Sequence, residues 1–481
     1  MQVRYRYKLR PSFTQQSLMS EWLVTLRKHR NYSLREREDG WNTNNRDADE
    51  RVGYAWGACC DVETRIEWGS CCPLTCPVVK HGVMSAALTK TSKKKGLQWG
   101  SAADVQGKRT TELRHESNWF GRINSDVLQR NIARLNSAYS GFWQHGHGFP
   151  SYQRAATFKS FEYKPSQVKF ASDTVYLPGI GQMRYFNSRP FPVTSQLRTA
   201  TVIKEAHGWY VSVLVKTPEE LPVVTDVENL SSNVSFDVGI NKLASLSDGS
   251  HIENPKFSTN KRMRRRIRIR QRRVNRKVKG SNNRAKAGVA VAKLHKQVRD
   301  KRDAYQWKAA NKIAKTAESV THEALQIKNM KKRCKPKRSK GRFMPNGQAA
   351  KRGLNRSISD AAWGALFQKV AWLAAKMGKP VFTFEPAYSS QECSKCQHRS
   401  ADNRKGEKFI CVNCGHIDHA DTQAARTGQK RIRLSFVSKD IKNLLVDCEK
   451  VTPVRYAPAS NGKRAQGRNP ISKQLSLFKP G

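Results

Sequence analysis

The chain has 481 residues, roughly three times the length of a typical domain, so the sequence predicts several modules and not one core. Its 89 lysines and arginines outnumber 38 aspartates and glutamates, and a formal net charge of +51 would make the chain repel itself without a polyanionic partner. With 38% hydrophobic residues, the composition argues against wholesale disorder, and the lack of any long uncharged apolar run argues against a membrane protein.

The charge predicts a nucleic acid as the partner, because each phosphate that is neutralised releases a counterion and strengthens binding. A polybasic membrane-surface protein would need an amphipathic helix or a lipid anchor, and neither stands out. Residues 1–10 are basic and no apolar segment follows them, so we expect no secretory signal and a cytoplasmic protein. The eleven cysteines should then be reduced thiols or metal ligands.

The N-terminal part predicts a strand followed by helices. Apolar residues alternate over 1–10, which is typical of a strand, and Pro11 ends it. Apolar residues recur at helical spacing over 15–32 and again over 125–142. Residues 36–115 between them show no clear pattern and contain five of the eleven cysteines.

The central part changes from strands to a basic helical hairpin. Short alternating runs over 155–216, separated by Gly and Pro, predict a small β-barrel or sheet, and 234–240 predicts a further strand. Lysine and arginine occupy 12 of the 19 positions over 261–279, and apolar residues continue at helical spacing beyond it. Another strand is predicted at 320–325.

The C-terminal part alternates between helix, strand and connector. Residues 329–342 form a basic, glycine-containing connector, and an apolar stripe over 363–377 predicts a helix that Gly378 ends. A strand follows at Val381–Phe384. From about Gly428 the chain is basic and polar, which predicts a mobile tail.

Four cysteines have the spacing of a metal site. Two Cys-x-x-Cys pairs, Cys393 with Cys396 and Cys411 with Cys414, can place four thiolates around one tetrahedral Zn²⁺. The alternative is two buried or disulfide-bonded pairs, which a reduced compartment disfavours. The cysteines over 59–76 follow no recognised ligand spacing.

Three carboxylates are candidates for a second metal centre. Asp237 and Glu323 interrupt otherwise apolar strands, where a carboxylate is costly unless a cation or hydrogen bonds compensate it. Asp421 follows the cysteines. Three acids converging from separate segments suit two Mg²⁺ ions that cleave a phosphodiester. Taken singly, each acid fits a surface residue or a helix cap better, and spacing alone does not decide.

The chain resembles the TnpB family of transposon-encoded RNA-guided nucleases, whose close relatives are the compact type V CRISPR effectors. Six segments carry the resemblance in the family's order, and the N-terminal segments YKLRP and FP carry it more weakly. The six are FDVGINKLASLSDG (236–249), EALQIKNM (323–330), NRSISDAAW (355–363), PAYSSQECSKC (386–396), CVNCG (411–415) and DTQAA (421–425).

The resemblance implies roles for both residue sets. In that family the three acids form a RuvC-like (RNase H-like) nuclease site, so Asp237, Glu323 and Asp421 are expected to be catalytic and to bind Mg²⁺ or Mn²⁺. It also implies that the four cysteines hold Zn²⁺ in a zinc ribbon. Gln423 stands where the family usually has Asn, and Glu323 is followed by Ala and not by an acid, but neither departure removes a metal ligand.

Two further features also have simpler interpretations. The basic run can be a solvated helix face, but its density of charge favours phosphate contacts. Its candidate nucleic-acid-binding residues are Lys261, Arg262, Arg264, Arg265, Arg266, Arg268 and Arg270. His322 fits a packing or hydrogen-bonding residue better than a general base.

The predicted fold class is α+β, multidomain, in two lobes. The predicted modules are a β-barrel, wedge-like module (1–12 and 150–228), a helical recognition module (13–149) with an unrecognised insertion at about 36–115, a RuvC-like nuclease domain (229–388 and 415–428), a zinc-ribbon insert that binds target nucleic acid (389–414) and a basic, disordered tail (429–481).

The predicted function is RNA-guided DNA endonuclease. A guide RNA would pair with one strand of double-stranded target DNA, and the protein would recognise the A-form shape of the heteroduplex and a short adjacent motif. The alternatives are a guide-RNA-dependent DNA binder that represses transcription without cutting, and a transposition accessory factor that binds DNA without a guide. The intact acid trio favours cleavage, and the expected location is the prokaryotic cytoplasm, at the nucleoid.

Overall fold

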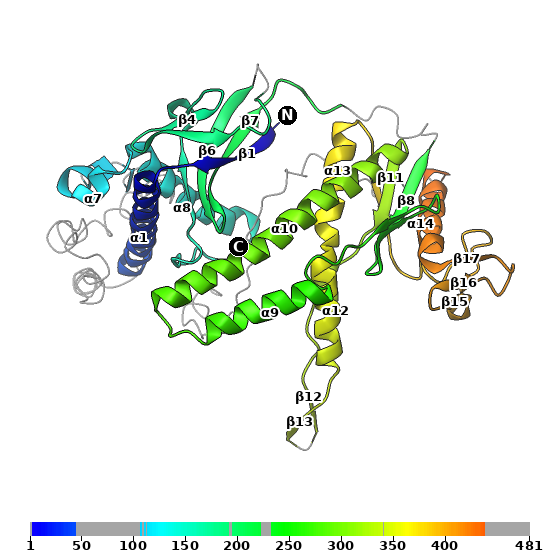
Figure 1. Ribbon diagram of the computed structural model, residues 1–481. Helices are drawn as coiled ribbons and strands as arrows, with labels where there is room; N and C mark the ends of the chain where they lie inside the picture. Colours follow the sequence, from blue (N-terminus) through cyan, green and yellow to red (C-terminus); the bar gives the residue numbers. More distant parts are fainter. Residues whose placement is uncertain are drawn as a thin grey trace. The chain divides into compact units, whose positions relative to one another are not determined.

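The computed structural model describes most of the chain outside the predicted insertion and tail. It covers residues 2–44, 106–107, 110–111, 113–191, 195–222, 232–339 and 341–437. The cysteines over 59–76 and the tail beyond residue 437 lie outside the described residues, so the predictions for them stay open. The chain divides into two compact units, Met1–Leu221 with Lys261–Asp300 and Pro222–Asn260 with Lys301–Gly481 (Figure 1).

The first unit contains a seven-stranded antiparallel sheet in the order β2-β6-β7-β1-β5-β4-β3. The strands are β1 (Gln2–Arg10), β2 (Ser160–Tyr163), β3 (Lys169–Phe170), β4 (Thr174–Leu177), β5 (Gly181–Phe186), β6 (Gln196–Glu205) and β7 (Gly208–Lys216). The N-terminal strand predicted over 1–10 is confirmed, and it lies between two strands from far along the chain.

The described part of this unit also contains the helices α1 (Phe13–Asn44), α7 (Asn118–Gly121) and α8 (Ser125–His145). Both longer helices were predicted from their apolar periodicity, and both are confirmed. Asn124 caps α8 by accepting the Asp126 N–H, and Gly146 ends it in the left-handed region at φ 61°. Trp22 of α1 is buried beside Phe161 of β2, so helix and sheet share one core.

The basic hairpin predicted beyond residue 261 consists of α9 (Lys261–Asn275) and α10 (Asn282–Thr316) (Figure 1). No residue of α9 is buried. In the first unit, Glu205 of β6 accepts ion pairs from Arg6, from Lys296 at 2.7 Å and from Arg299 at 3.2 Å. Burial opposes ionisation of Glu205, but the hydrogen bonds from Lys296 and Arg6 prevail and lower its pKa to about 2.

The second unit is built on a five-stranded mixed sheet in the order β10-β9-β8-β11-β14. Its strands are β8 (Asn233–Asp237), β9 (Lys242–Leu246), β10 (His251–Glu253), β11 (Ser319–Glu323) and β14 (Val381–Phe384). Strands β8, β9 and β10 pair antiparallel, whereas β8, β11 and β14 are parallel. The three predicted strands in this region are confirmed. All five residues of β11 are buried, as expected for the middle of a parallel set.

Among the described residues, the second unit contains the C-terminal part of α10 and the helices α11 (Ile327–Met330), α12 (Gln348–Ala361), α13 (Trp363–Lys376) and α14 (Ala420–Val437). The predicted helix over 363–377 is confirmed as α13. Helix α14 lies against β8, β9, β11 and β14, and it continues past Gly428, where the sequence predicts the tail to begin.

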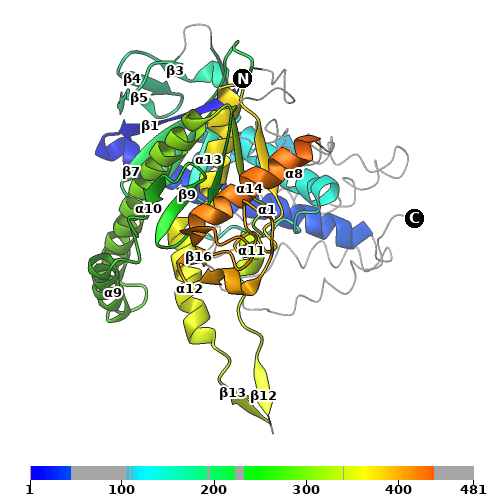
Figure 2. The same ribbon diagram turned by 90° about the vertical axis from the view of Figure 1, so that its right-hand side faces the viewer.

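A small three-stranded antiparallel sheet and a two-stranded hairpin also belong to the second unit. Strands β15 (Arg404–Lys405), β16 (Lys408–Ile410) and β17 (Ile417–His419) follow a short 3₁₀ turn (Ala401–Asn403) in the cysteine-rich segment. The segment predicted as a plain connector contains a two-stranded hairpin, β12 (Lys337–Ser339) with β13 (Arg342–Met344). In Figures 1 and 2 this hairpin extends beyond the start of α12. Among the helices that the structure describes, none combines the length and the apolar character needed to cross a membrane.

Candidate functional site

The three predicted acids lie at one edge of the second unit's sheet. Asp237 is the last residue of β8 and Glu323 is the last residue of β11. These strands are parallel with His322 opposite Phe236, so the two acids leave the same carboxyl edge. Asp421 lies in the first turn of α14, which contacts both strands. The fold therefore brings together three carboxylates that are far apart in sequence.

Electrostatic repulsion links the three acids. Burial raises the pKa of the Asp237 carboxyl well above its usual range, and the negative charges of Glu323 and Asp421 raise it further. The Val238 N–H and the Arg404 guanidinium oppose this rise without cancelling it. A bound cation would reverse the balance, because an opposite charge at short range favours the ionised carboxylate.

Glu323 is held by a hydroxyl group from another segment. It is 8% exposed, and burial raises its pKa. The Ser389 hydroxyl donates to Glu323 Oε1 at 2.5 Å, and this bond together with the charge of Arg431 opposes the rise. Ser389 is itself buried and also donates to the Pro386 carbonyl oxygen at 3.2 Å. The Glu323 side chain is therefore fixed in place.

Asp421 is partly exposed and has a cationic neighbour. Arg404 Nη2 lies 3.5 Å from Asp421 Oδ1, with both side chains partly exposed. The position of Asp421 at the start of α14 also favours its negative charge, because a helix N-terminus carries a partial positive charge.

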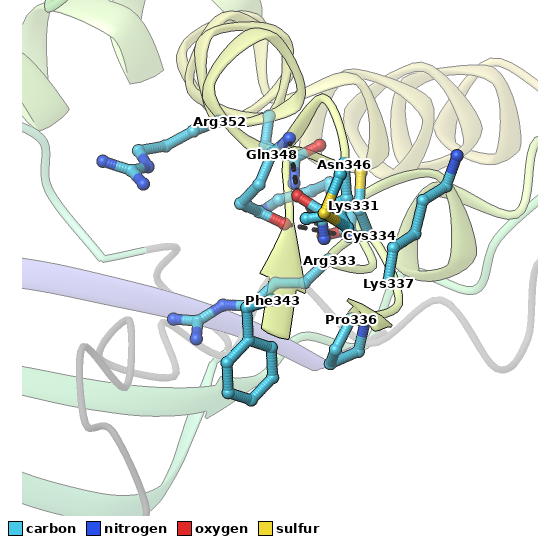
Figure 3. A pocket seen from close by; sticks show the side chains of 11 residues that line it. Lys331, Arg333, Cys334, Pro336, Lys337, Phe343, Asn346, Gln348 and Arg352 are labelled. Carbon is cyan, nitrogen blue, oxygen red and sulfur yellow. Dashed lines mark hydrogen bonds between the residues drawn. The ribbon is translucent and has the colours of Figure 1, made fainter. Parts of the chain in front are cut away.

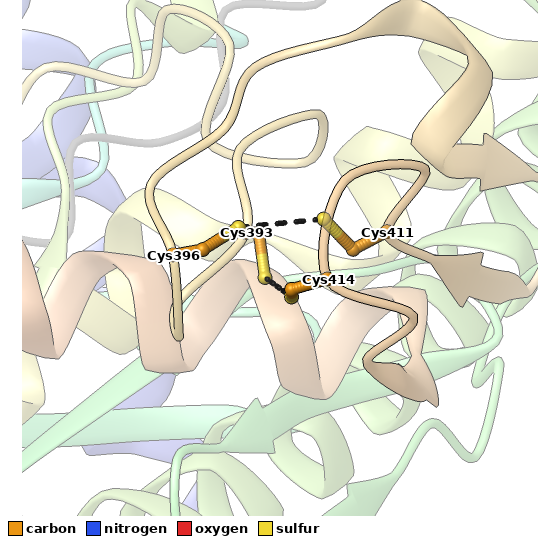
Figure 4. Close-up of side chains that lie close together, drawn as sticks. All are labelled: Cys393, Cys396, Cys411 and Cys414. Carbon is orange, nitrogen blue, oxygen red and sulfur yellow. Dashed lines mark hydrogen bonds between the residues drawn. The ribbon is translucent and has the colours of Figure 1, made fainter.

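The four cysteines form a tighter group than the three acids. Their Sγ atoms all lie within 4.8 Å of one another, and this is the one group of three or more potential ligands that the described residues bring so close. Cys393 Sγ lies 3.7 Å from Cys414 Sγ, and Cys396 Sγ lies 3.5 Å from Cys411 Sγ (Figure 4). All four are free thiols, so the predicted alternative of disulfide-bonded pairs is wrong. The cluster could hold a metal ion.

The two cysteine pairs have the same backbone geometry. The Gln397 N–H donates to the Cys393 carbonyl oxygen at 2.8 Å, and the Gly415 N–H donates to the Cys411 carbonyl oxygen at 2.9 Å. Gln397 and Gly415 both adopt the left-handed region, at φ 63° and 69°. Each pair therefore folds into an equivalent turn that turns both thiols inward, and in the first turn a non-glycine residue accepts the strained conformation.

The thiols differ in their surroundings. The backbone N–H of His398 lowers the pKa of Cys396 to about 6. Burial raises the pKa of Cys393 to about 12, against the opposing N–H groups of Cys396 and Lys395. At both cysteines, backbone N–H groups therefore point at the sulfur atom and favour its ionised, thiolate form.

Helix α14 anchors the cysteine-rich segment beside the acids. Gln423 is fully buried, and its Nε2 donates to the Glu392 carbonyl oxygen at 3.1 Å while its Oε1 accepts from Ser394 at 3.0 Å. Thr427 donates to the same Glu392 carbonyl at 3.0 Å. The longer glutamine, noted in the sequence as a departure from the family pattern, thus joins Asp421's helix to the first cysteine turn.

The backbone just before the basic helix α9 is held by a buried carboxylate. Asp360, buried near the end of α12, accepts the N–H groups of Ser258 and Thr259 at 2.9–3.0 Å and the Thr259 hydroxyl at 2.8 Å. Every candidate cation from Lys261 to Arg270 is exposed, as a phosphate-binding or a solvated face both require.

His322 packs as the sequence suggested. Its ring stacks on Phe367 with centroids 4.2 Å apart, and Nδ1 donates to the Glu323 carbonyl oxygen at 2.9 Å. Burial lowers its pKa, which favours the neutral ring.

Three further residues contact the acids or their surroundings, although the sequence pattern predicts no role for them. They are Ser389, Arg404 and Arg431. Arg431 donates to the carbonyl oxygens of Glu385 and Ala387, and so holds the segment that leads to Ser389. Ser389 lies within the segment PAYSSQECSKC, and only that position could have drawn attention to it.

Family models match the two halves of this site. A model described as OrfB_IS605, "Probable transposase", matches residues 211–334, and one described as "Cas12f1-like, TNB domain" matches residues 363–427. The first range contains Asp237 and Glu323, and the second contains the four cysteines and Asp421.

Curated relatives match over most of the chain. A protein of Escherichia coli (strain K12) with the provisional name RNA-guided DNA endonuclease InsQ is 34% identical over 339 residues, which cover 69% of this chain and 80% of the relative. A Streptomyces pristinaespiralis protein, provisionally named an RNA-guided DNA endonuclease, is 29% identical over 332 residues, with coverages of 68% and 75%. Among solved structures, a Cas12f1-sgRNA-target DNA complex is similar with a TM-score of 0.44 and 13% identity, covering 89% of this chain and 98% of that chain.

Proposed function

The chain belongs to the family of RNA-guided DNA endonucleases that the Escherichia coli relative represents, and we propose that it is itself an endonuclease that a guide RNA directs to DNA. The observation that carries the proposal is the convergence of Asp237, Glu323 and Asp421 at one sheet edge, where the charges of Glu323 and Asp421 add to burial in raising the pKa of Asp237. Repelling carboxylates in a buried site are expensive unless cations bind there.

The five-stranded sheet with α14 is then the RuvC-like (RNase H-like) nuclease domain. Asp237, Glu323 and Asp421 would hold Mg²⁺ or Mn²⁺, which when bound activates water and stabilises the leaving oxygen of a phosphodiester. The protein's own contribution is positional. Ser389 fixes Glu323 through its hydroxyl group, and Arg404 places a positive charge beside Asp421.

The cysteine cluster is proposed to be the structural zinc site of a zinc ribbon that contacts target nucleic acid. Four thiolates about 2.3 Å from a tetrahedral Zn²⁺ stand about 3.8 Å apart, and the separations of 3.5 and 3.7 Å in the structure support this fit. The site would be closed, because four protein ligands complete the tetrahedron.

The proposed partners are a guide RNA and the double-stranded DNA that it pairs with as a heteroduplex. The exposed cations of α9 support binding along phosphates. The antiparallel sheet of the first unit is proposed as the wedge-like module, with the helices α1 and α8 as part of the recognition module. A location in the prokaryotic cytoplasm, at the nucleoid, follows from this function.

The test is cleavage of guide-matched DNA by single-acid variants. Asp237→Ala, Glu323→Ala and Asp421→Ala should each reduce cleavage to background and leave RNA and target binding intact, because each removes a ligand of one shared centre. The effects should not add, so a double variant should equal a single one. Glu253→Gln, which changes an exposed acid of β10, is the matched control and should cut normally. Full cleavage by Asp421→Ala would refute the proposal.

Copurified RNA separates the guided nuclease from a DNA-binding factor without a guide. A discrete RNA that stays bound at high salt is expected, and sequencing it would give the guide. Mg²⁺ or Mn²⁺ should be required for cutting, whereas Ca²⁺ should support binding alone. A wild-type complex that binds matched DNA but leaves it uncut in Mg²⁺ and Mn²⁺ would instead favour the transcription repressor.

A further inference from the structure

The hairpin β12–β13 and the start of α12 enclose a basic pocket that the nuclease site does not use. Its volume is about 830 Å³, and none of its eleven lining residues is acidic. Four of them are cationic: Lys331, Arg333, Lys337 and Arg352. All four are exposed, so the pocket presents concentrated positive charge to solvent.

The pocket is lined by an aromatic ring, Phe343, that is not packed into a hydrophobic core. Phe343 is 68% exposed and Met344 is 49% exposed. The Arg338 guanidinium lies 4.5 Å from the centre of the Phe343 ring. Figure 3 shows Arg333 and Arg352 extending toward the same side of the view as Phe343. A two-stranded ribbon is only marginally stable by itself, so exposing its largest apolar side chains is costly unless a partner covers them.

Amide side chains hold the pocket in shape. The Cys334 N–H donates to Gln348 Oε1 at 2.9 Å, Asn346 Nδ2 donates to the Lys335 carbonyl oxygen at 2.9 Å, and Asn355 Nδ2 donates to the Lys331 carbonyl oxygen at 2.8 Å. These bonds fasten the basic loop to α12. The backbone that carries the cations is therefore held against the helix, and the gathering of positive charge favours a ligand with several negative charges.

We propose that this pocket binds a single-stranded stretch of nucleic acid, with Phe343 stacked on an unpaired base and Lys331, Arg333 and Arg352 contacting the flanking phosphates. An exposed ring among cations suits a single strand, because a free base offers its face for stacking while the backbone meets positive charge. A duplex offers phosphates but keeps its base faces stacked inside. An acidic peptide would satisfy the cations and leave the ring without a stacking partner.

The proposal concerns binding and stands apart from cleavage by the three acids. Affinities are measured on the full-length protein with Ca²⁺ in place of Mg²⁺ and without a chelator, so that no cutting occurs and the cysteine cluster keeps any bound metal. The probes are a fluorescein-labelled oligothymidylate and a blunt duplex of equal length. If Asp237→Ala cuts normally while the pocket variants behave as expected, the nuclease assignment fails and the pocket stands. If Asp237→Ala does not cut while the pocket variants bind like the wild type, the nuclease assignment stands and the pocket proposal fails.

The first variant removes the ring and keeps the charge. Phe343→Leu should weaken binding of the oligothymidylate by about fivefold or more and leave duplex affinity unchanged, because stacking one base contributes roughly 1–3 kcal/mol, which is about fivefold to 150-fold. Phe343→Trp should retain single-strand affinity. Phe13→Leu, at an 86% exposed phenylalanine of α1, is the matched control and should have no effect. Equal losses for single strand and duplex, or no loss for either, would overturn the proposal.

The second variant removes charge and keeps the ring. Arg333→Gln combined with Arg352→Gln should flatten the log–log salt dependence of oligothymidylate binding by about 0.7 per lost phosphate contact, whereas Phe343→Leu should leave the slope unchanged. Both sites are exposed, and thermal melting curves like that of the wild type would verify folding.

Photocrosslinking locates the contact directly. An oligonucleotide that contains 5-iodouridine should crosslink to the peptide containing Phe343, and Phe343→Leu should abolish that product. Excess unlabelled single strand should compete for it, and an equal charge of polyglutamate should not. Crosslinks confined to other peptides, or competition by polyglutamate as effective as by the single strand, would assign the pocket to another partner and refute the proposal.

Discussion

His29 shows how far burial alone can move a side chain's chemistry. The ring is 2% exposed, lies edge-on to Phe120 and accepts a hydrogen bond at Nδ1 from Asn131 Nδ2 at 3.3 Å. Burial lowers its pKa from 6.5 to about 4. The folded protein therefore keeps a neutral histidine in a pH range where the unfolded chain protonates it.

This difference predicts a pH dependence of stability. Between pH 6.5 and 4 the unfolded state binds the extra proton, so the free energy of unfolding should be largest above pH 6.5 and should fall by about 3 kcal/mol as pH drops to 4. Urea unfolding of the wild type and of His29→Gln across this range would measure it. The variant should lose that part of the slope, and parallel curves would contradict the assignment.

Cys396 tests whether the cysteine cluster is the proposed zinc site. Cys396→Ser removes one thiolate, and because structural zinc contributes folding free energy of roughly 10 kcal/mol or more in small metal-folded domains, the variant should lose stoichiometric zinc and the order of residues near 389–420. Elemental analysis and hydrogen exchange would measure both.

Cys334→Ser is the matched control, because this free cysteine lies outside the cluster, and its zinc content should equal that of the wild type. An active protein purified without chelator and found free of zinc would rule the site out.

At the scale of elements, the contact between α14 and the sheet depends on a missing side chain. A Cβ at Gly428 would lie 2.3 Å from Phe384 Cε1 and 2.8 Å from the Ser235 hydroxyl oxygen. Only glycine therefore lets α14 approach β8 and β14 closely enough to bring Asp421 to the two strand-end acids. A glycine inside a helix otherwise reads as a weakness in the sequence.

Gly428→Ala should destabilise the second unit by about 1–3 kcal/mol through overpacking and should reduce cleavage, since α14 carries Asp421. Denaturant unfolding and cleavage assays would measure both. Gly353→Ala is the matched control: an added Cβ there meets nothing within 4 Å, and the change at this exposed position of α12 should stabilise by up to about 1 kcal/mol. Equal effects of the two substitutions would contradict the close-approach argument.

At the scale of the whole molecule, a net charge of +51 requires polyanions, and α9 is the densest source of that charge. The helix buries none of its side chains, so its cations cost self-repulsion that packing within the described residues does not compensate. Guide RNA should relieve this repulsion, and coexpression with it should raise the solubility of the protein.

Neutralising five arginines together tests the role of α9. The change replaces Arg264, Arg265, Arg266, Arg268 and Arg270 with glutamine. Nucleic-acid affinity should fall and the log–log salt slope should flatten by roughly 0.7–0.9 per lost phosphate contact, with sequence preference unchanged because phosphate contacts position and do not specify. Ile269→Gln, on the same helix and without a charge change, should leave the slope as it is. An unchanged slope in the five-fold variant would place the phosphate contacts elsewhere.

Local pattern was enough to determine many individual elements. Alternation and helical periodicity predicted β1, α8, α13 and β14, because burial of one face imposes a period that the sequence carries within a few residues. The two Cys-x-x-Cys pairs likewise contain their turn geometry locally.

Contacts between distant segments required the tertiary structure. Glu323 accepts a hydrogen bond from Ser389, and Asp421 pairs with Arg404. Both contacts join segments that are distant in sequence, so no local periodicity predicts them. The segment 329–342 read as a connector, because exposed basic strands lack the alternation that a buried face produces. The acids could be named from the sequence and the family resemblance. Their convergence depends on the parallel register of β8 with β11 and on Gly428, which lets α14 approach the sheet. Only the tertiary structure decides this, because electrostatic coupling depends on distance in space and not on separation along the chain.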